Sequence, residues 1–133
     1  MGSKAGGRTL GIRVLIVDDT DHVREMLSQM LALDGFDVVG KARGGPEAIE
    51  IAKELSPDVV IMDYKMPGMD GITATRALRA ISPTVPVILY TAYLDAELEG
   101  RARDAGISAC IGKVEGITSL EREISALCLE LVS

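Results

Sequence analysis

The sequence predicts an α/β sandwich built on a parallel β-sheet. From residue 12 onward, short apolar runs of strand length alternate with longer segments whose apolar residues recur with a period near 3.6. Several of the short runs are continuously apolar rather than alternating, which is typical of strands covered on both faces. Right-handed crossovers between such strands place helices on both sides of the sheet, so we expect five strands and five helices in alternation.

The five predicted strands are short apolar runs bounded by charged or turn-forming residues. They span Arg13–Val17, Asp37–Lys41, Val59–Met62, Val87–Tyr90 and Ala109–Ile111. The first, third and fourth are the continuous runs, and they indicate a parallel sheet.

The first helix is predicted to begin at Asp21, which is placed to cap it, and to end at Gly35. Its apolar residues follow the i, i+3, i+4, i+7, i+8 spacing of a helix that faces a core. They are Val23, Met26, Leu27, Met30 and Leu31. We expect the methionines among them to fill the core and the neighbouring His22 to lie on the surface without a functional role.

The second helix is predicted to begin at Pro46, because proline suits a first helical turn. The third follows a tight turn at Met66–Gly71, in which Gly71 lets the chain bend. A fourth, around Asp95–Ala105, offers the core little beyond Leu98 and Ala102, so it should be weakly held. The second helix is expected to bury Ala48, Ile51, Ala52 and Leu55, and the last helix Leu120, Ile124, Leu127 and Leu131.

Length and composition indicate one domain. The chain has 133 residues and is 47% hydrophobic, enough for one core. Residues 1–11 are Gly-rich and polar and are interpreted as a flexible tail or an expression remnant, which leaves residues 12–133 as the domain. A net charge of −6 disfavours binding of nucleic acid or an anionic membrane, so proteins and cations are the expected partners.

The cysteines and the apolar runs indicate the compartment. Cys110 and Cys128 are far from any CxxC spacing and, with His22 as the single histidine, cannot form a zinc site. They are expected to be small core residues in a reducing environment. The sequence also contains neither a run of about 20 apolar residues nor the apolar core of a signal peptide. A cytoplasmic location is therefore expected.

Chemically active side chains follow the strands where a ligand is expected, because ligands of such sheets bind beyond the carboxyl ends of the strands. They are Asp18 and Asp19 after the first strand, Asp63 after the third, Thr91 after the fourth and Lys113 after the fifth. Adjacent carboxylates repel by about 1 kcal/mol at 4 Å in water, and about four times that near a protein surface. A hard divalent cation with oxygen ligands would offset this repulsion, and Mg²⁺ suits a site with few protein ligands.

A hydroxyl and an ammonium group beside such an ion suit a phosphoryl group, whose oxygens need donors and positive charge. One of the carboxylates could then accept the phosphate as a nucleophile. Each residue alone has an ordinary structural explanation, such as helix capping by Asp18 and Asp19 or a solvated Lys113. Only their combination at the strand ends predicts Mg²⁺-dependent phosphoryl chemistry on an aspartate.

Four segments carry a resemblance to a known family. VLIVDDTD, DVVIMDYKMPGMDG, PVILYTA and AGISACIGK together resemble the receiver domain of bacterial two-component response regulators, from about residue 12 to the end. The segment from Asp58 to Gly71 is the most specific match. The resemblance implies a flavodoxin-like (βα)5 fold, doubly wound, with a five-stranded parallel sheet of order 2-1-3-4-5.

The resemblance also assigns roles to the acidic residues. It implies that Asp63 is the phosphoacceptor, and that Asp19 and Asp63 ligate Mg²⁺ (or Mn²⁺) with the backbone carbonyl of Lys65. Asp18 would act through a water on the ion.

The same resemblance implies that Thr91 and Lys113 contact the phosphoryl oxygens. The donor would be a sensor histidine kinase or a phosphotransfer protein. The face formed by the fourth helix, fifth strand and fifth helix would switch on phosphorylation and could mediate a homodimer.

Some positions depart from the family pattern. Cys110 stands where receivers usually carry a Tyr or Phe that turns inward, which puts the usual coupling from Thr91 in doubt, and Val114 replaces a common proline. Lys65 and Tyr93 are expected to flank the phosphoryl group and obstruct hydrolytic water. Slow autodephosphorylation is therefore predicted.

The sequence is also compatible with two alternatives. Asp19-Thr20-Asp21 also resembles the nucleophile motif of haloacid-dehalogenase-type phosphatases, with Asp19 as nucleophile, although that reaction leaves Asp63 without a role. A pseudo-receiver that serves only as an interaction module is the second alternative. The output is also open, since the domain could stand alone or be the N-terminal part of a longer, DNA-binding regulator.

Overall fold

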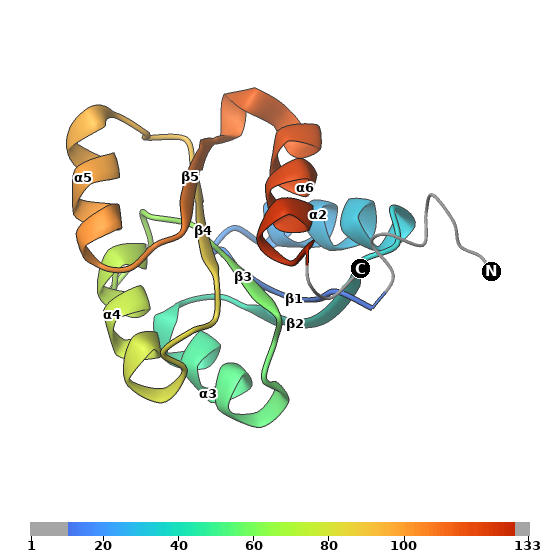
Figure 1. Cartoon of the computed structure of the whole chain (residues 1–133), viewed down its shortest axis with the longest axis horizontal. Coiled ribbons are helices and arrows are strands. Elements are labelled where there is room, and N and C mark those ends of the chain that lie inside the picture. Colours follow the sequence, from blue (N-terminus) through green and yellow to red (C-terminus); the bar gives the residue numbers. More distant parts are fainter. Residues whose placement is uncertain (1–10, 130–133) are drawn as a thin grey trace.

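The computed structural model describes residues 11–129, in which five strands and five α-helices alternate along the chain (Figure 1). The strands are β1 (Arg13–Val17), β2 (Asp37–Ala42), β3 (Val59–Met62), β4 (Val87–Thr91) and β5 (Ala109–Gly112). The helices are α2 (Asp21–Leu33), α3 (Gly45–Leu55), α4 (Gly71–Ile81), α5 (Ala96–Asp104) and α6 (Gly116–Leu127), with a short 3₁₀ helix, η1 (Lys113–Glu115). Residues 1–10 of the predicted tail, and Leu131 of the last helix, lie outside the described range.

The strands form one parallel sheet of order β2-β1-β3-β4-β5, which confirms the predicted fold class and strand order. Helices α2 and α6 cover one face and α3, α4 and α5 the other (Figure 1). Three strands match their predicted starts and run one residue further, and the other two match at both ends. Among the helices described, none is long and apolar enough to cross a membrane.

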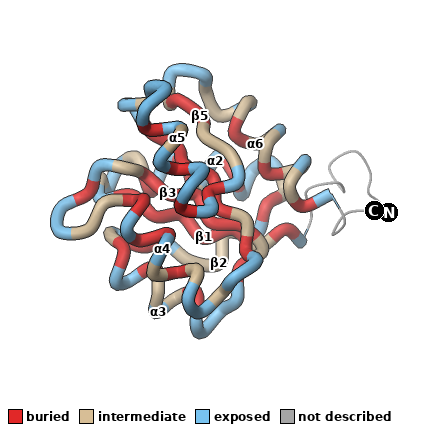
Figure 2. The backbone as a smooth tube through the Cα atoms, turned by 60° about the vertical axis from the view of Figure 1, so that its left-hand side comes forward, coloured by how far each residue is buried: buried red, intermediate tan, exposed pale blue. Residues whose placement is uncertain are grey.

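Each face of the sheet carries its own core, which explains the continuous apolar runs. In β1, Leu15 and Val17 belong to the core beneath α3, α4 and α5, whereas Val14 and Ile16 belong to the core beneath α2 and α6. Successive side chains of a strand point to opposite faces. Every residue must therefore be apolar where both faces are covered, and Figure 2 shows these strand segments as the buried centre of the molecule.

The start and the buried face of α2 differ from the prediction. Thr20 takes the N-cap position without a side-chain hydrogen bond, and Asp21 is the first helical residue. Met26 and Met30 are 48% and 37% exposed, so the expectation that they fill the core is wrong. The helix covers the sheet with a narrower stripe than expected, and its buried residues are Arg24, Leu27 and Leu31.

The end of α2 follows the prediction. Gly35 has a φ of 97°, a conformation that glycine adopts without a steric penalty. The Gly35 N–H donates to the Ala32 carbonyl at 3.1 Å, and the Phe36 N–H donates to the Leu31 carbonyl at 3.0 Å. These two bonds form a Schellman motif, which satisfies carbonyls that the helix end would otherwise leave free.

Helix α3 includes Pro46 in its first turn and buries Ala48 and Ala52 as predicted, with Ile51 partly buried. Leu55 was expected in the core but is 38% exposed, because the helix ends at this residue.

Gly68 and Gly71 have different structural roles in the turn before α4. Gly68 has a φ of 83° and makes the tight turn. At Gly71 an added Cβ would fall within van der Waals distance of the Asp63 carbonyl oxygen and 3.0 Å from the Asp63 carbonyl carbon. Gly71 is therefore needed for close approach of two backbone segments, and the predicted bending role belongs to Gly68.

The last two helices follow the prediction where they are described. Helix α5 buries only Leu98 and Ala102, and its N-cap residue Asp95 accepts a hydrogen bond from the Leu98 N–H at 2.8 Å. Helix α6 buries Leu120 and Ile124, whereas Leu127 is partly buried. Helix α5 is thus held to the sheet by fewer apolar side chains than α4.

Candidate functional site

The carboxyl ends of β1 and β3 bring the predicted acidic residues together. These strands pair in parallel with Val17 opposite Met62, and the Asp63 N–H donates to the Val17 carbonyl at 2.9 Å. The residues that follow the two strands therefore leave the sheet side by side. Asp18 and Asp63 are buried, whereas Asp19 is exposed.

The three carboxylates form one cluster. Asp18, Asp19 and Asp63 each offer an oxygen atom, and the three atoms lie within 4.8 Å of one another. Oxygen donors at this spacing fit a hard divalent cation such as Mg²⁺. The convergence of carboxylates that the sequence predicted is confirmed.

Lys113 contacts two of these carboxylates from the end of β5. Its Nζ lies 3.0 Å from Asp18 Oδ2 and 3.6 Å from Asp63 Oδ2. Burial lowers the pKa of Lys113, but its hydrogen bond to Asp18 and the negative charges of Asp63 and Asp18 outweigh this and raise the pKa above its ordinary value. Lys113 is therefore a permanent positive charge in the cluster at neutral pH.

Asp63 has a strongly perturbed carboxyl group. Burial raises its pKa to about 6, opposed by the charge of Lys113 and aided by the charge of Asp18. The Tyr64 N–H donates to Asp63 Oδ1 at 2.8 Å and favours the ionised form. At neutral pH Asp63 is mainly a carboxylate, the form that acts as a nucleophile.

Thr91 is fully buried at the end of β4, the strand that pairs with β3. Its Oγ1 accepts a hydrogen bond from the Tyr93 N–H at 3.2 Å. The predicted position of Thr91 at the carboxyl end of the sheet is thus confirmed, and its hydroxyl bonds to the backbone of the loop that leads into α5.

Asp18 is fixed by further contacts, one of which is not predicted from the sequence. Its Oδ1 accepts from the Thr20 N–H at 2.9 Å, so the predicted capping role applies to the turn before α2. Its backbone carbonyl accepts from Arg24 Nη1 at 2.7 Å, and Arg24 also pairs with Asp21. An arginine within the apolar stripe of α2, three residues after an aspartate, is the sequence signal for this anchor.

Two contacts between cations and aromatic rings join the segment after Asp63 to the segment after Thr91. Lys65 Nζ lies 5.0 Å from the centre of the Tyr93 ring. Arg101 donates from Nη1 to the Tyr64 hydroxyl at 3.1 Å, and its guanidinium carbon lies 5.7 Å from the centre of that ring. The sequence predicts a role for Lys65 and Tyr93 but not for Tyr64 and Arg101, because a separation of 37 positions gives no local signal.

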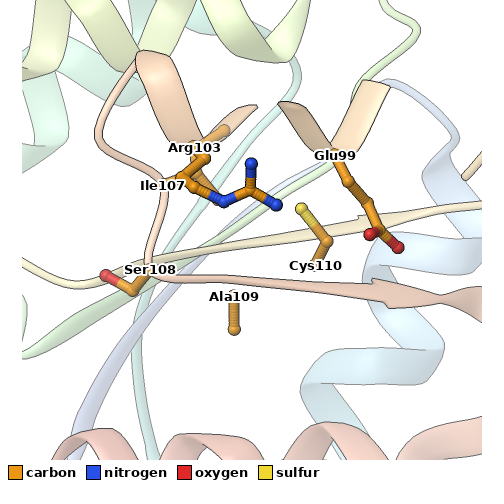
Figure 3. Close-up of a pocket in the computed structure, with 6 residues that line it drawn as sticks. All are labelled: Glu99, Arg103, Ile107, Ser108, Ala109 and Cys110. Carbon is orange, nitrogen blue, oxygen red and sulfur yellow. The ribbon is translucent and has the colours of Figure 1, made fainter. Parts of the chain in front are cut away.

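Cys110 lies in β5, on the side of the sheet that α5 covers. Figure 3 shows its thiol between the side chains of Arg103 and Glu99, beside a hollow of about 220 Å³. Cys110 is only partly buried, whereas Cys128 is buried, so the prediction of core cysteines is confirmed fully for Cys128 alone. Burial and the charge of Glu99 raise the pKa of the Cys110 thiol.

Residues 14–125 match the family model of the response regulator receiver domain. The response regulator GacA of Pseudomonas viridiflava is 42% identical over 114 residues, which cover 85% of this chain and 53% of GacA. The transcriptional regulatory protein PdtaR of Mycobacterium tuberculosis is 42% identical over 125 residues, covering 86% of this chain and 60% of PdtaR. The chain thus spans little more than half the length of these relatives.

The fold has close counterparts among solved structures. A chain in the crystal structure of the CheX–CheY–BeF3–Mg²⁺ complex from Borrelia burgdorferi superposes with a TM-score of 0.84 at 27% identity. The match covers 92% of this chain and 98% of that one. Together with the family match, this likeness does not favour the phosphatase or pseudo-receiver alternatives.

Proposed function

Because this chain belongs to the receiver domain family of two-component response regulators, we propose that Asp63 is its phosphoacceptor. The observation that carries the proposal is the cluster of Asp18, Asp19, Asp63 and Lys113 at one edge of the sheet. A receiver domain is a phosphoacceptor rather than a turnover enzyme. The transfer forms a bond between an Asp63 oxygen and phosphorus and breaks the phosphorus–nitrogen bond of a phosphohistidine, whose imidazole keeps the bonding electron pair.

Asp19 and Asp63 are the proposed direct ligands of Mg²⁺ (or Mn²⁺), with the Lys65 backbone carbonyl, and Asp18 acts through a water. The ion supplies positive charge that offsets the carboxylates and stabilises the transferring phosphoryl group. Lys113, already held between Asp18 and Asp63, contributes a second positive charge. After the transfer, the Asp63 oxygen no longer carries the negative charge that Lys113 faces, and the ammonium group binds a phosphoryl oxygen instead.

Thr91 binds a second phosphoryl oxygen in this proposal. Its hydroxyl now bonds to the Tyr93 N–H, so turning toward the phosphoryl group would alter the loop between β4 and α5. This movement is the proposed signal to the face formed by α5, β5 and α6. Cys110 on that face lacks the ring of the family pattern, so we propose that it contributes little to the switch.

Lys65 and Tyr93 are proposed to slow the loss of the phosphoryl group. Lys65 stands two positions after Asp63 and Tyr93 two positions after Thr91, and the Lys65 Nζ lies 5.0 Å from the centre of the Tyr93 ring, which supports this proposal. Both restrict the approach of the water that hydrolyses an acyl phosphate. Lys65→Asn and Tyr93→Ala should each shorten the phosphate half-life, and an unchanged half-life in both variants would overturn this part of the proposal.

The proposed partners follow from the same family membership. A sensor histidine kinase or phosphotransfer protein delivers the phosphoryl group in the cytoplasm, and the α5, β5 and α6 face is a candidate homodimer surface. The net charge of −6 supports protein partners rather than nucleic acid or membrane for this domain. The relatives are longer than this chain, and PdtaR is a transcriptional regulatory protein, so we propose an output through a further domain, which could be a DNA-binding one.

Intact-mass measurement after incubation with Mg²⁺ and acetyl phosphate tests the proposal. A single phosphoryl adduct is expected, and it should be absent with EDTA and in Asp63→Asn. No adduct under any condition would favour an interaction module. Turnover of the donor that survives Asp63→Asn but not Asp19→Asn would favour the phosphatase.

A further inference from the structure

Tyr64 joins the acidic site to the start of α4 through its backbone. Its N–H donates to Asp63 Oδ1 at 2.8 Å, and its carbonyl accepts from the Gly71 N–H at 2.7 Å. The first bond is to an ionised acceptor, and such bonds are stronger than those between neutral groups. The position of Tyr64 therefore depends on the charge and orientation of the Asp63 carboxylate.

The side chain of Tyr64 extends this connection to α5. Its hydroxyl accepts from Arg101 Nη1 at 3.1 Å, and the Arg101 guanidinium carbon lies 5.7 Å from the ring centre. A planar guanidinium suits both kinds of contact at once. Because α5 buries only Leu98 and Ala102, the contact with Tyr64 adds to a small number of contacts that hold this helix.

Lys65 and Tyr93 form a second pair between the same two segments, but here the cation follows Asp63 and the ring follows Thr91. The segment after Asp63 contributes the ring of Tyr64 and the cation of Lys65, whereas the segment after Thr91 contributes the ring of Tyr93 and the cation of Arg101. These four residues line a hollow of about 320 Å³ together with Asp95, Glu97 and Leu98.

We propose that Arg101 is a positioning residue of the loop that carries Asp63, and that its contact with Tyr64 transmits the state of Asp63 to α5. The proposal rests on the proposed function, since it requires a phosphoryl group on Asp63. Formation of the acyl phosphate removes the negative charge shared by the two carboxylate oxygens, which weakens the bond from the Tyr64 N–H. Tyr64 then shifts, and Arg101 moves with it. Because coupling between sites is reciprocal, the position of α5 also influences the Asp63 carboxylate through this contact.

Hydrogen exchange of the α5 amides, with and without beryllofluoride and Mg²⁺ as a phosphoryl analogue, tests the proposal. The proteins are the wild type, Tyr64→Phe, Arg101→Met, the double variant and Arg103→Met. Arg103 is an exposed arginine of the same helix that faces Cys110 instead of Tyr64, so it is the matched control. Phe keeps the ring of Tyr64 and removes only its hydroxyl.

In the wild type, beryllofluoride should change the exchange rate of the α5 amides. The effect is the factor by which beryllofluoride changes the exchange rates of these amides. This factor should be smaller by about two- to thirtyfold in Tyr64→Phe and in Arg101→Met. The double variant should lose no more than either single variant, because the two residues act as one contact. Arg103→Met should respond as the wild type does.

Bound beryllofluoride is observed separately by ¹⁹F NMR, which distinguishes two kinds of failure. A wild type that binds no beryllofluoride overturns the proposed function and this inference with it. Binding in all five proteins with an undiminished α5 response in Tyr64→Phe and Arg101→Met overturns this inference alone. Equal losses in Arg103→Met and Arg101→Met also overturn it, because the effect would then reflect general weakening of α5.

Discussion

Replacing Gly71 with alanine tests whether the loop that carries Asp63 is packed as closely as the structure indicates. The new Cβ would overlap the Asp63 carbonyl oxygen and lie 3.0 Å from both the Asp63 carbonyl carbon and Met62 Cγ. Carbon atoms normally approach to about 3.5 to 4.0 Å. The start of α4 must therefore move away from β3, because a backbone carbonyl at the end of a buried strand cannot yield.

The expected loss of stability follows from two contributions. Overpacking of this kind costs about 1–3 kcal/mol, and loss of the 2.7 Å bond from the Gly71 N–H to the Tyr64 carbonyl costs about 1 kcal/mol more. The better helix propensity of alanine returns about 1 kcal/mol. A net loss of about 1–3 kcal/mol is expected, measured as a lower urea midpoint with an unchanged slope.

Two other glycines provide the controls. A Cβ at Gly100 in α5 meets no atom within 4 Å, so Gly100→Ala should stabilise the protein by about 0.5–1 kcal/mol. Gly68→Ala forces alanine to a φ of 83°, which costs about 1–2 kcal/mol without contact with Asp63. Gly71→Ala should also slow phosphorylation by acetyl phosphate more than Gly68→Ala does. A Gly71→Ala protein with wild-type stability and wild-type phosphorylation would refute the close packing of this loop.

Three further predictions concern charged groups. Burial and the neighbouring Asp34 raise the pKa of Glu121 to about 7, so the folded state binds more protons than the unfolded state between about pH 4.5 and 7. Stability should fall as pH rises through this window, and Glu121→Gln should lessen the fall in urea titrations at pH 5 and 8. The pKa of Asp63 is about 6, so protons compete with Mg²⁺ for this carboxylate at low pH. Calorimetry should therefore find the Mg²⁺ affinity about tenfold weaker at pH 5 than at pH 7. An affinity that does not depend on pH would contradict the role of Asp63 in binding the ion. Arg79 donates to the backbone carbonyls of Ser82, Val85 and Gly106 at 3.3, 2.5 and 2.6 Å, so Arg79→Met should lower the free energy of unfolding by about 1.5–3 kcal/mol. As a control, Arg76→Met on the exposed side of α4 should change it by less than about 0.5 kcal/mol.

The sheet and the acidic cluster could be predicted because each depends on a local pattern. A strand buried on both faces must be apolar throughout, and residues that follow parallel strands share one edge of the sheet. Asp18, Asp19 and Asp63 therefore could be placed together before their distances were known. Lys113 could be placed at the same edge, but its ion pairs with Asp18 and Asp63 could not be predicted, because they depend on the conformation of its long side chain.

Other features depend on contacts that a local pattern does not encode. Periodicity placed Met26 and Met30 toward the core, but the width of the stripe that a helix buries depends on what lies against it. The same limit applies to Arg24, because one of its two partners is the Asp18 backbone carbonyl, which lies outside the helix. Tyr64 and Arg101 meet across 37 positions, and only the arrangement of α5 beside the loop after β3 brings them together.

The thin anchoring of α5 sets an energy scale for signalling. Burial of one leucine contributes about 1.5–3 kcal/mol, and an alanine contributes less, so Leu98 and Ala102 together hold the helix with only a few kcal/mol. Coupling free energies between sites are commonly about 1–3 kcal/mol. A change of one charge at Asp63 is thus of the right size to displace α5. Helix α4 presents five buried residues to the sheet and would resist the same force, so motion should concentrate in the helix that the core holds least.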